Sequence, residues 1–225
     1  MSWRPGSRVS RVRASHTYRF VLLLIFLTFV FIMAAPDKTW AQSVLGLLLT
    51  GILILAIWTS GLGLRAPRTL VVIVIGVGAA VLLQTVSSDT VIGAAWLVGL
   101  ILAAAIMAVI ALGMADQGEV NQQSVVGAIC IYLMLGMFFS FAYGSTAKLG
   151  SGYFFAQGTD GTPAIRLYFS YITMATVGYG DYTASGDFGR TLAVLEGLFG
   201  QLYLVTVVAL LVSQLGPGSF SRRSS

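Results

Sequence analysis

Long apolar runs, separated by short polar joints, dominate this 225-residue chain and restrict the folds that it can adopt. Hydrophobic residues make up 57% of the chain and charged residues only 9%, whereas a soluble domain carries about 25% charged residues. A helix crosses the roughly 30 Å hydrocarbon core of a bilayer with about 20 apolar residues. The sequence therefore predicts an integral membrane protein built entirely from α-helices.

Six apolar runs are interpreted as membrane crossings, and a shorter, half-apolar segment lies between the fifth and the sixth. The expected crossings are residues 20–35, 43–64, 70–86, 91–114, 125–143 and 188–214, and the shorter segment is 163–174. These runs divide the chain into a basic tail (1–19), a four-helix membrane domain (20–114), a linker (115–124), a second membrane domain (125–214) and a short tail (215–225).

The arginines predict which side of the membrane each segment faces. Nine of them lie in residues 1–19, in the RAPR sequence at 65–68 and in residues 215–225. Positively charged loops stay cytoplasmic, so we expect both termini in the cytoplasm and the protein in a plasma membrane of the bacterial inner-membrane type. The segment 173–181 then lies in the outer half of the bilayer.

The first apolar run has a second interpretation. Arginines precede it, and the sequence TWA comes just before Gln42, a pattern that also fits a cleaved signal peptide. Cleavage would leave five crossings in the same orientation. We favour an uncleaved first helix.

Several function classes are disfavoured by the polar residues. Cys130 is the only cysteine, so it allows no intrachain disulfide and suggests no thiolate metal site. Ser145 could act as a nucleophile only with a base, but the single histidine, His16, lies in the N-terminal tail, which is expected across the membrane. The net charge of +5 indicates contact with anionic lipid rather than nucleic acid. We expect no enzyme, no cofactor and no nucleic-acid partner.

The sequence TMATVGYGD at residues 173–181 is unlike the apolar runs around it. Gly178 and Gly180 alternate with Val177 and Tyr179, and glycine adopts positive φ without a Cβ clash. A backbone that alternates in handedness can point successive carbonyls the same way, which an ordinary strand cannot do. Four such segments around one axis would form rings of oxygens that replace the water around an ion.

The TVGYG sequence resembles the selectivity filter of potassium channels, and the resemblance extends over residues 122–214 as outer helix, pore helix, filter and inner helix. It implies a homotetramer in the lipid bilayer that passes K⁺ along a four-fold axis, with 163–174 as a re-entrant pore helix. K⁺ would bind the backbone oxygens of the first four filter residues and the hydroxyl of the first. The expected filter residues are Thr176, Val177, Gly178, Tyr179 and Gly180.

Residues around the filter are expected to support it. Thr162 can cap the short helix, and Pro163 suits its first position. By their position in the family, Tyr168 and Phe169 form an aromatic pair beside the filter. The resemblance further implies a hydrogen bond from Tyr168 to Asp181.

The last apolar run resembles the inner helix of the family. Gly200 aligns with the position of a gating hinge, but it can equally be a glycine that lets helices pack. Gln201, Leu204, Val208 and Val212 are spaced by three or four residues and share one helix face. We expect this face to line the cavity, with Val208 and Val212 as an apolar constriction that gates by dewetting.

Glu196 is the only carboxylate expected deep within a crossing. A charge at mid-membrane costs about 2.5–3.5 kcal/mol on insertion scales, so the residue needs a partner or a proton. One interpretation places it behind or below the filter, bonded to a pore-helix hydroxyl or attracting cations. The other, which we favour, is a protonated or paired structural residue.

The resulting hypothesis is a potassium-selective channel without an arginine voltage sensor, because residues 91–114 contain no Arg or Lys. The sequence does not identify the gating stimulus. Two alternatives stay open. One is a non-conducting regulatory subunit of another channel, and the other is a potassium-transporter subunit, although such chains are long and carry four degenerate filter repeats.

Overall fold

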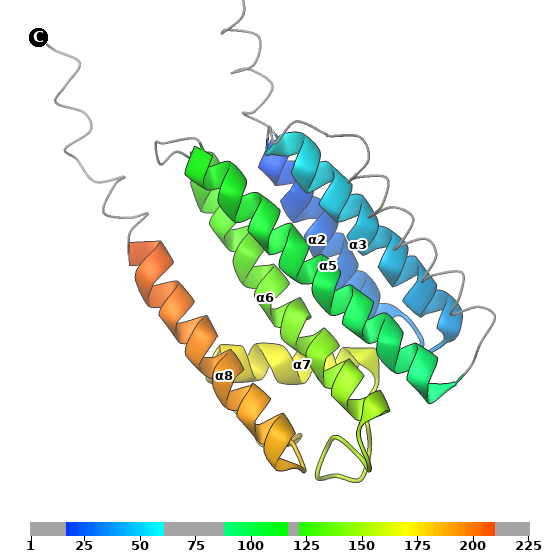
Figure 1. The fold of residues 1–225 in the computed structure, drawn as a ribbon. Coiled ribbons are helices and arrows are strands. Elements are labelled where there is room, and N and C mark those ends of the chain that lie inside the picture. The colour runs from blue at the N-terminus through cyan, green and yellow to red at the C-terminus, as the bar shows by residue number, and fades with distance from the viewer. Residues whose placement is uncertain (1–16, 61–87, 117–121, 210–225) are drawn as a thin grey trace, which may run out of the picture.

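The computed structural model describes residues 17–60, 88–116 and 122–209 of the chain. Within these residues all the regular structure is helical, with six α-helices and one π-helical turn (Figure 1). The elements are α2 (Thr17–Ala34), α3 (Thr39–Thr59), α5 (Asp89–Asp116), α6 (Gln122–Leu149), α7 (Pro163–Met174), α8 (Asp187–Tyr203) and the π-helical turn η1 (Leu204–Val208).

The helices largely follow the apolar runs, and α7 has the same bounds as the predicted short segment. The fifth run was expected to end at residue 143, but α6 continues to Leu149. The hydroxyls of Ser145 and Thr146 donate to the backbone oxygens of Phe141 and Ala142, four residues earlier. These bonds satisfy the two hydroxyls within α6, where such residues are otherwise neutral to unfavourable.

Three described helices are long and apolar enough to cross a membrane, namely Trp40–Thr59, Asp89–Asp116 and Gln122–Leu149. The helix over Tyr18–Ala34 is also apolar but shorter. The crossing predicted at 70–86 lies outside the described residues, as do most of the predicted tails and residues 117–121 of the predicted linker. Six crossings therefore stay a prediction.

Helix α6 is the centre of the arrangement, with contacts to α2, α5, α7 and α8. In Figure 1, α2, α3 and α5 lie on one side of α6 and α8 lies on the other, while α7 runs across the bundle near one end. Helix α7 thus reaches both the N-terminal helices and α8. This arrangement positions the segment that follows α7.

The N-terminal helices α2, α3 and α5 pack with α6 through apolar side chains. The buried cluster includes Val21, Ile25, Ile52, Ile106 and Met137. Close approach of α5 and α6 depends on Gly144, where an added Cβ would lie 2.8 Å from the Trp96 ring.

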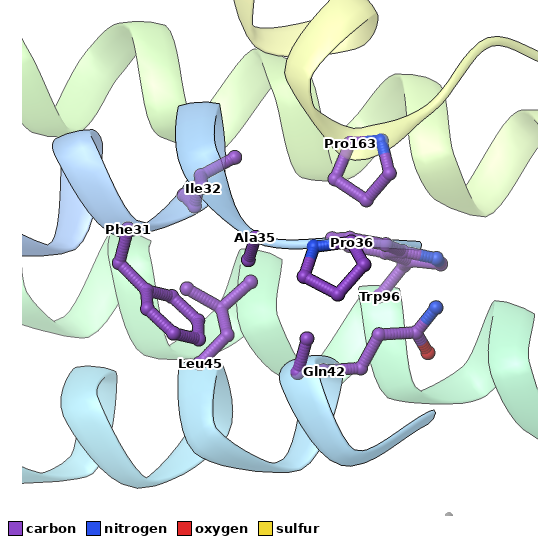
Figure 2. Close-up of a pocket in the computed structure, with 9 residues that line it drawn as sticks. Phe31, Ile32, Ala35, Pro36, Gln42, Leu45, Trp96 and Pro163 are labelled. Atoms are coloured by element: carbon purple, nitrogen blue, oxygen red, sulfur yellow. The ribbon is translucent and has the colours of Figure 1, made fainter. Parts of the chain in front are cut away.

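The first turn of α7 docks on the N-terminal helices. Figure 2 shows Pro163 facing Pro36 and Trp96 across a small pocket, which residues of α2 and α3 also line. Arg166, one turn further along α7, is 2% exposed, and its guanidinium carbon lies 4.8 Å from the centre of the Trp96 ring. Its Nη1 also donates to the backbone oxygen of Gly161 at 2.6 Å. A buried cation therefore joins α7 to α5, a contact that the sequence did not indicate.

Candidate functional site: the segment after α7

The segment that follows α7 has an alternating backbone. The φ angles of Thr176, Gly178 and Gly180 are +56°, +54° and +77°, whereas those of the residues between them are negative. This confirms the alternation that the two glycines predicted. It also begins two residues before the first glycine, because Thr176 adopts a positive φ that is uncommon for a residue with a Cβ.

The start of this segment is tied to the last turn of α7. The amides of Val177 and Gly178 both donate to the backbone oxygen of Ile172, at 2.8 and 3.2 Å, and the amide of Thr176 donates to that of Thr173 at 3.0 Å. These bonds use carbonyls that a helix end otherwise leaves without a partner. The conformation of the segment is therefore coupled to the position of α7.

The start of α7 has the cap that the sequence predicted. The Thr162 hydroxyl oxygen accepts a hydrogen bond from the amide of Ile165 at 3.3 Å, and Pro163 lies in the first turn. Both residue types are favoured there because the first amides of a helix have no partner within it.

Beyond the alternating segment, the hydrogen bond expected between Tyr168 and Asp181 is present. The Tyr168 hydroxyl donates to Oδ2 of Asp181 at 2.9 Å. Phe169 is buried instead in an aromatic cluster, with its ring centre 5.3 Å from that of Phe155 and 5.2 Å from that of Tyr143. The two neighbours in sequence thus contact different parts of the molecule.

The loop 150–162, which precedes α7, is hydrogen-bonded to residues 183–185, which follow the alternating segment. The sequence did not indicate this pairing. The amide of Ala156 donates to the Thr183 oxygen at 2.8 Å, and the amide of Ser185 donates to the Phe154 oxygen at 2.9 Å. Phe155 forms an isolated antiparallel bridge with Ala184. The aromatic sequence YFF at 153–155 indicates that this loop is packed against other residues, but it does not identify those residues.

Helix α8 approaches the end of α7 at Gly200. An added Cβ there would lie 2.9 Å from the backbone oxygen of Met174, and Gln201 Nε2 donates to the same oxygen at 3.2 Å. Helix α8 continues through Gly200 without a break. The geometry favours the packing interpretation of Gly200 over that of a hinge.

The spacing on which the predicted cavity face was based changes in the structure, while the cavity itself stays a prediction. The α-helix expected over 188–214 ends at Tyr203 and passes into the π-helical turn Leu204–Val208. A π-helical turn bonds residue i to i+5, so spacings of three and four no longer define one face. Gln201 faces α7 through its bond to Met174. The side chain of Val208, and all of Val212, lie outside the described residues.

Glu196 is 0% exposed and lies between three helices. Its Oε2 accepts a hydrogen bond from the Tyr143 hydroxyl at 2.5 Å, and its Oε1 is bonded to the Ser170 hydroxyl. Ser170 is the expected type of partner, a hydroxyl of the pore helix, whereas Tyr143 of α6 was not predicted. Burial within one chain favours the structural interpretation of Glu196 over that of a group attracting cations.

One comparison with known proteins finds a match over this part of the chain. Residues 127–216, from the start of α6 to beyond η1, match a protein family described as ion channel. No curated protein and no solved structure matches the chain. The match supports an ion channel and, with the apolar helices, a membrane protein.

Proposed function

We propose that this chain is the subunit of a homotetrameric channel that passes K⁺ selectively and passively through residues 176–180. The observation that carries the proposal is positive φ at every second residue of TVGYG, at Thr176, Gly178 and Gly180. This alternation lets successive carbonyls face one side of the chain. A column of such oxygens is what a dehydrated K⁺ requires.

In this proposal the backbone oxygens of Thr176, Val177, Gly178 and Tyr179 bind K⁺, and the Thr176 hydroxyl forms the innermost ring. Each oxygen takes the place of a water molecule, so entry into the filter need not leave the ion without ligands. One chain supplies one wall of this site. Four walls complete the rings, which is why the proposal requires four copies.

The surface of the single chain supports assembly. Tyr179 is 70% exposed, and a groove beside the filter runs between α7 and α8, lined by Thr173, Gly178 and Ala193 among others. Helix α8 also has an exposed apolar row. Its members are Val194, Leu198, Leu202 and Val205 of η1. We assign the groove and the row to contacts with neighbouring copies, where Tyr179 would support the filter from behind.

The proposed channel has no arginine voltage sensor. Helix α5, Asp89–Asp116, contains no Arg or Lys, and a sensor moves several such charges through the membrane field. We assign α2, α3 and α5 to holding α7 in place, through contacts such as Arg166 over Trp96.

The deciding experiment measures K⁺ and Na⁺ flux through the purified chain in liposomes, together with the mass of the assembly in lipid. We expect K⁺ flux well above Na⁺ flux and a mass of four chains. Equal fluxes of the two ions would refute the filter. Absence of flux from the chain alone would favour a regulatory subunit, and a particle with one filter-bearing chain would favour a transporter.

A further inference from the structure

We infer that Glu196 carries a proton at neutral pH and, as a neutral carboxylic acid, positions the pore helix α7 between α6 and α8. The inference deepens the proposed function, and its consequence for selectivity rests on that function. The protonation state can be tested whether or not the chain conducts K⁺.

The carboxyl group of Glu196 and three other oxygen-bearing groups form a continuous series of contacts. The Tyr143 hydroxyl of α6 lies 2.5 Å from Oε2, and the Ser170 hydroxyl of α7 is bonded to Oε1. Oγ of Ser170 also lies 2.6 Å from the backbone oxygen of Gly136 on α6. Three contacts therefore join four oxygen-bearing groups from three helices.

Each of these contacts joins two oxygen atoms, so each needs one hydrogen between them. The hydroxyl of Tyr143 supplies one hydrogen and that of Ser170 supplies another, whereas the backbone oxygen of Gly136 can only accept. Two hydrogens cannot serve three contacts. The third belongs to the carboxyl group of Glu196.

The direction of each bond follows from the same count. Ser170 donates to Gly136, and its oxygen then accepts from the protonated Oε1 of Glu196, while Oε2 accepts from Tyr143. An ionised Glu196 can only accept, so the Ser170 hydroxyl would have to donate its hydrogen to Oε1. The oxygens of Ser170 and Gly136 would then face each other 2.6 Å apart with no hydrogen between them.

The surroundings of the carboxyl group favour the same state. An ionised carboxylate that is removed from water is strongly destabilising unless a cation compensates for it. Within the described part of the chain, the titratable groups that interact with Glu196 are the phenols of Tyr143 on α6 and Tyr171 on α7. A phenol donates a hydrogen bond but supplies no positive charge.

These contacts lie next to the start of the proposed filter, so they can influence its position. Ser170 lies one turn before the end of α7 at Met174, and the alternating segment begins directly afterwards. The acid of α8 and the backbone of α6 both bond Ser170, so they hold this turn from two sides. Glu196 is thus a positioning residue that acts on the filter through α7.

Infrared difference spectroscopy of the full chain in lipid vesicles at neutral pH tests the proton directly. The spectrum of the wild type minus that of Glu196→Gln should contain the C=O stretching band of a protonated carboxylic acid. Tyr143→Phe should move this band to higher frequency, because the C=O group loses the hydrogen bond at Oε2. Asp187→Asn removes an exposed carboxylate from the same helix and should leave the band unchanged. Carboxylate bands in place of the acid band would overturn the inference.

Ion flux through the same variants tests the positioning role. Glutamine offers an N–H to Ser170 and an oxygen to Tyr143, so Glu196→Gln should keep the preference for K⁺ over Na⁺. Glu196→Ala should lose that preference and, if it does not fold, Ser170→Ala should lose it instead. Reduced K⁺ flux in Glu196→Gln, with selectivity intact in Glu196→Ala or Ser170→Ala, would assign the carboxylate to attracting cations and overturn the positioning role. A wild-type chain that passes no K⁺ refutes the proposed function, and the infrared spectrum still decides the protonation.

Discussion

Polar side chains make different hydrogen bonds in the N-terminal helices α2, α3 and α5 and in the proposed pore segment, residues 122–209, which contains α6, α7 and α8. In α2 and α3, the buried hydroxyls of Thr28 and Thr50 donate to backbone oxygens four residues earlier in the same helix, both at 2.8 Å. In α7 and α8, two tyrosine hydroxyls bond instead to another helix, although Ser145 and Thr146 of α6 bond within their own helix. Tyr171 of α7 donates to the Leu133 oxygen of α6 at 2.6 Å, and Tyr203 of α8 donates to the Ala128 oxygen of α6 at 2.8 Å.

This difference has a physical meaning in a bilayer. Lipid tails are as apolar as leucine, so apolar contacts give helices little drive to keep one relative position, whereas close packing and interhelical hydrogen bonds do. A filter whose oxygens replace the hydration shell of an ion needs its supporting helix held in place. In the proposed pore segment, the hydrogen bonds of Tyr171 and Tyr203 to α6 fix the relative positions of the helices in this way.

The largest effect is expected from a change within the filter itself. Gly178→Ala forces a residue with a Cβ to adopt a φ of +54°, although the added Cβ would meet no atom within 4 Å, so the strain arises from the backbone alone. We expect loss of K⁺ selectivity in the liposome flux measurement. Gly186→Ala is the matched control, because its Cβ also has open space but its φ is −105°. Equal K⁺ selectivity of the two variants would show that positive φ at Gly178 is not required for selectivity.

A smaller effect is expected where α8 meets the end of α7. Gly200→Ala would place a Cβ 2.9 Å from the Met174 oxygen, and such overpacking costs about 1–3 kcal/mol. We expect a lower unfolding temperature and reduced K⁺ flux. Gly197→Ala, on the same helix, would place its Cβ 3.9 Å from the Thr173 oxygen and should be tolerated. An increase in flux with unchanged stability in Gly200→Ala would instead favour the hinge interpretation.

The comparison between the two regions can be tested with one pair of hydroxyl deletions. Tyr171→Phe removes a bond between α7 and α6, which we expect to lower stability by about 1 kcal/mol and to reduce K⁺ selectivity. Thr28→Val removes a bond within α2 and should change both quantities less. Thermal unfolding in lipid and ion flux provide the two measurements. If Thr28→Val proves the more damaging, the contrast between the regions is wrong.

The smallest effect is expected at the outer end of the filter. Tyr168→Phe removes the 2.9 Å bond to Asp181, which is exposed to solvent, so we expect only a small loss of stability. K⁺ selectivity should persist, with a somewhat lower K⁺ flux. Asp181→Asn, which keeps an acceptor for the tyrosine, should behave like the wild type. Complete loss of selectivity in Tyr168→Phe would make this bond part of the filter rather than a support.

Local features of the pore segment could be predicted from the sequence. The bounds of α7, its Thr162 cap and the alternating backbone at Gly178 and Gly180 all depend on residues close together in the chain. Helix capping and positive φ are properties of a few neighbouring residues, so a single sequence reports them well. The bond from Tyr168 to Asp181 was implied by the family resemblance and is also present.

Other features depended on which helices meet in space. Nothing near Glu196 in the sequence points to Tyr143, which is 53 residues away. The contact of Arg166 with Trp96, the pairing of the 150–162 loop with Thr183 and Ser185, and the π-helical turn at 204–208 were likewise missed. Apolar periodicity shows that a residue is buried in a helix but not which helix covers it.

The amino-acid sequence was sufficient to predict that the chain is helical and apolar enough for a membrane, and that one glycine-alternating segment differs from the apolar runs around it. These properties follow from composition, from hydrophobic run length and from the absence of a Cβ in glycine. How that segment is supported became visible only in the packed helices. Hydrogen bonds and close glycine contacts between α6, α7 and α8 depend on distances across the bundle, and those distances are set by the packing of many side chains together.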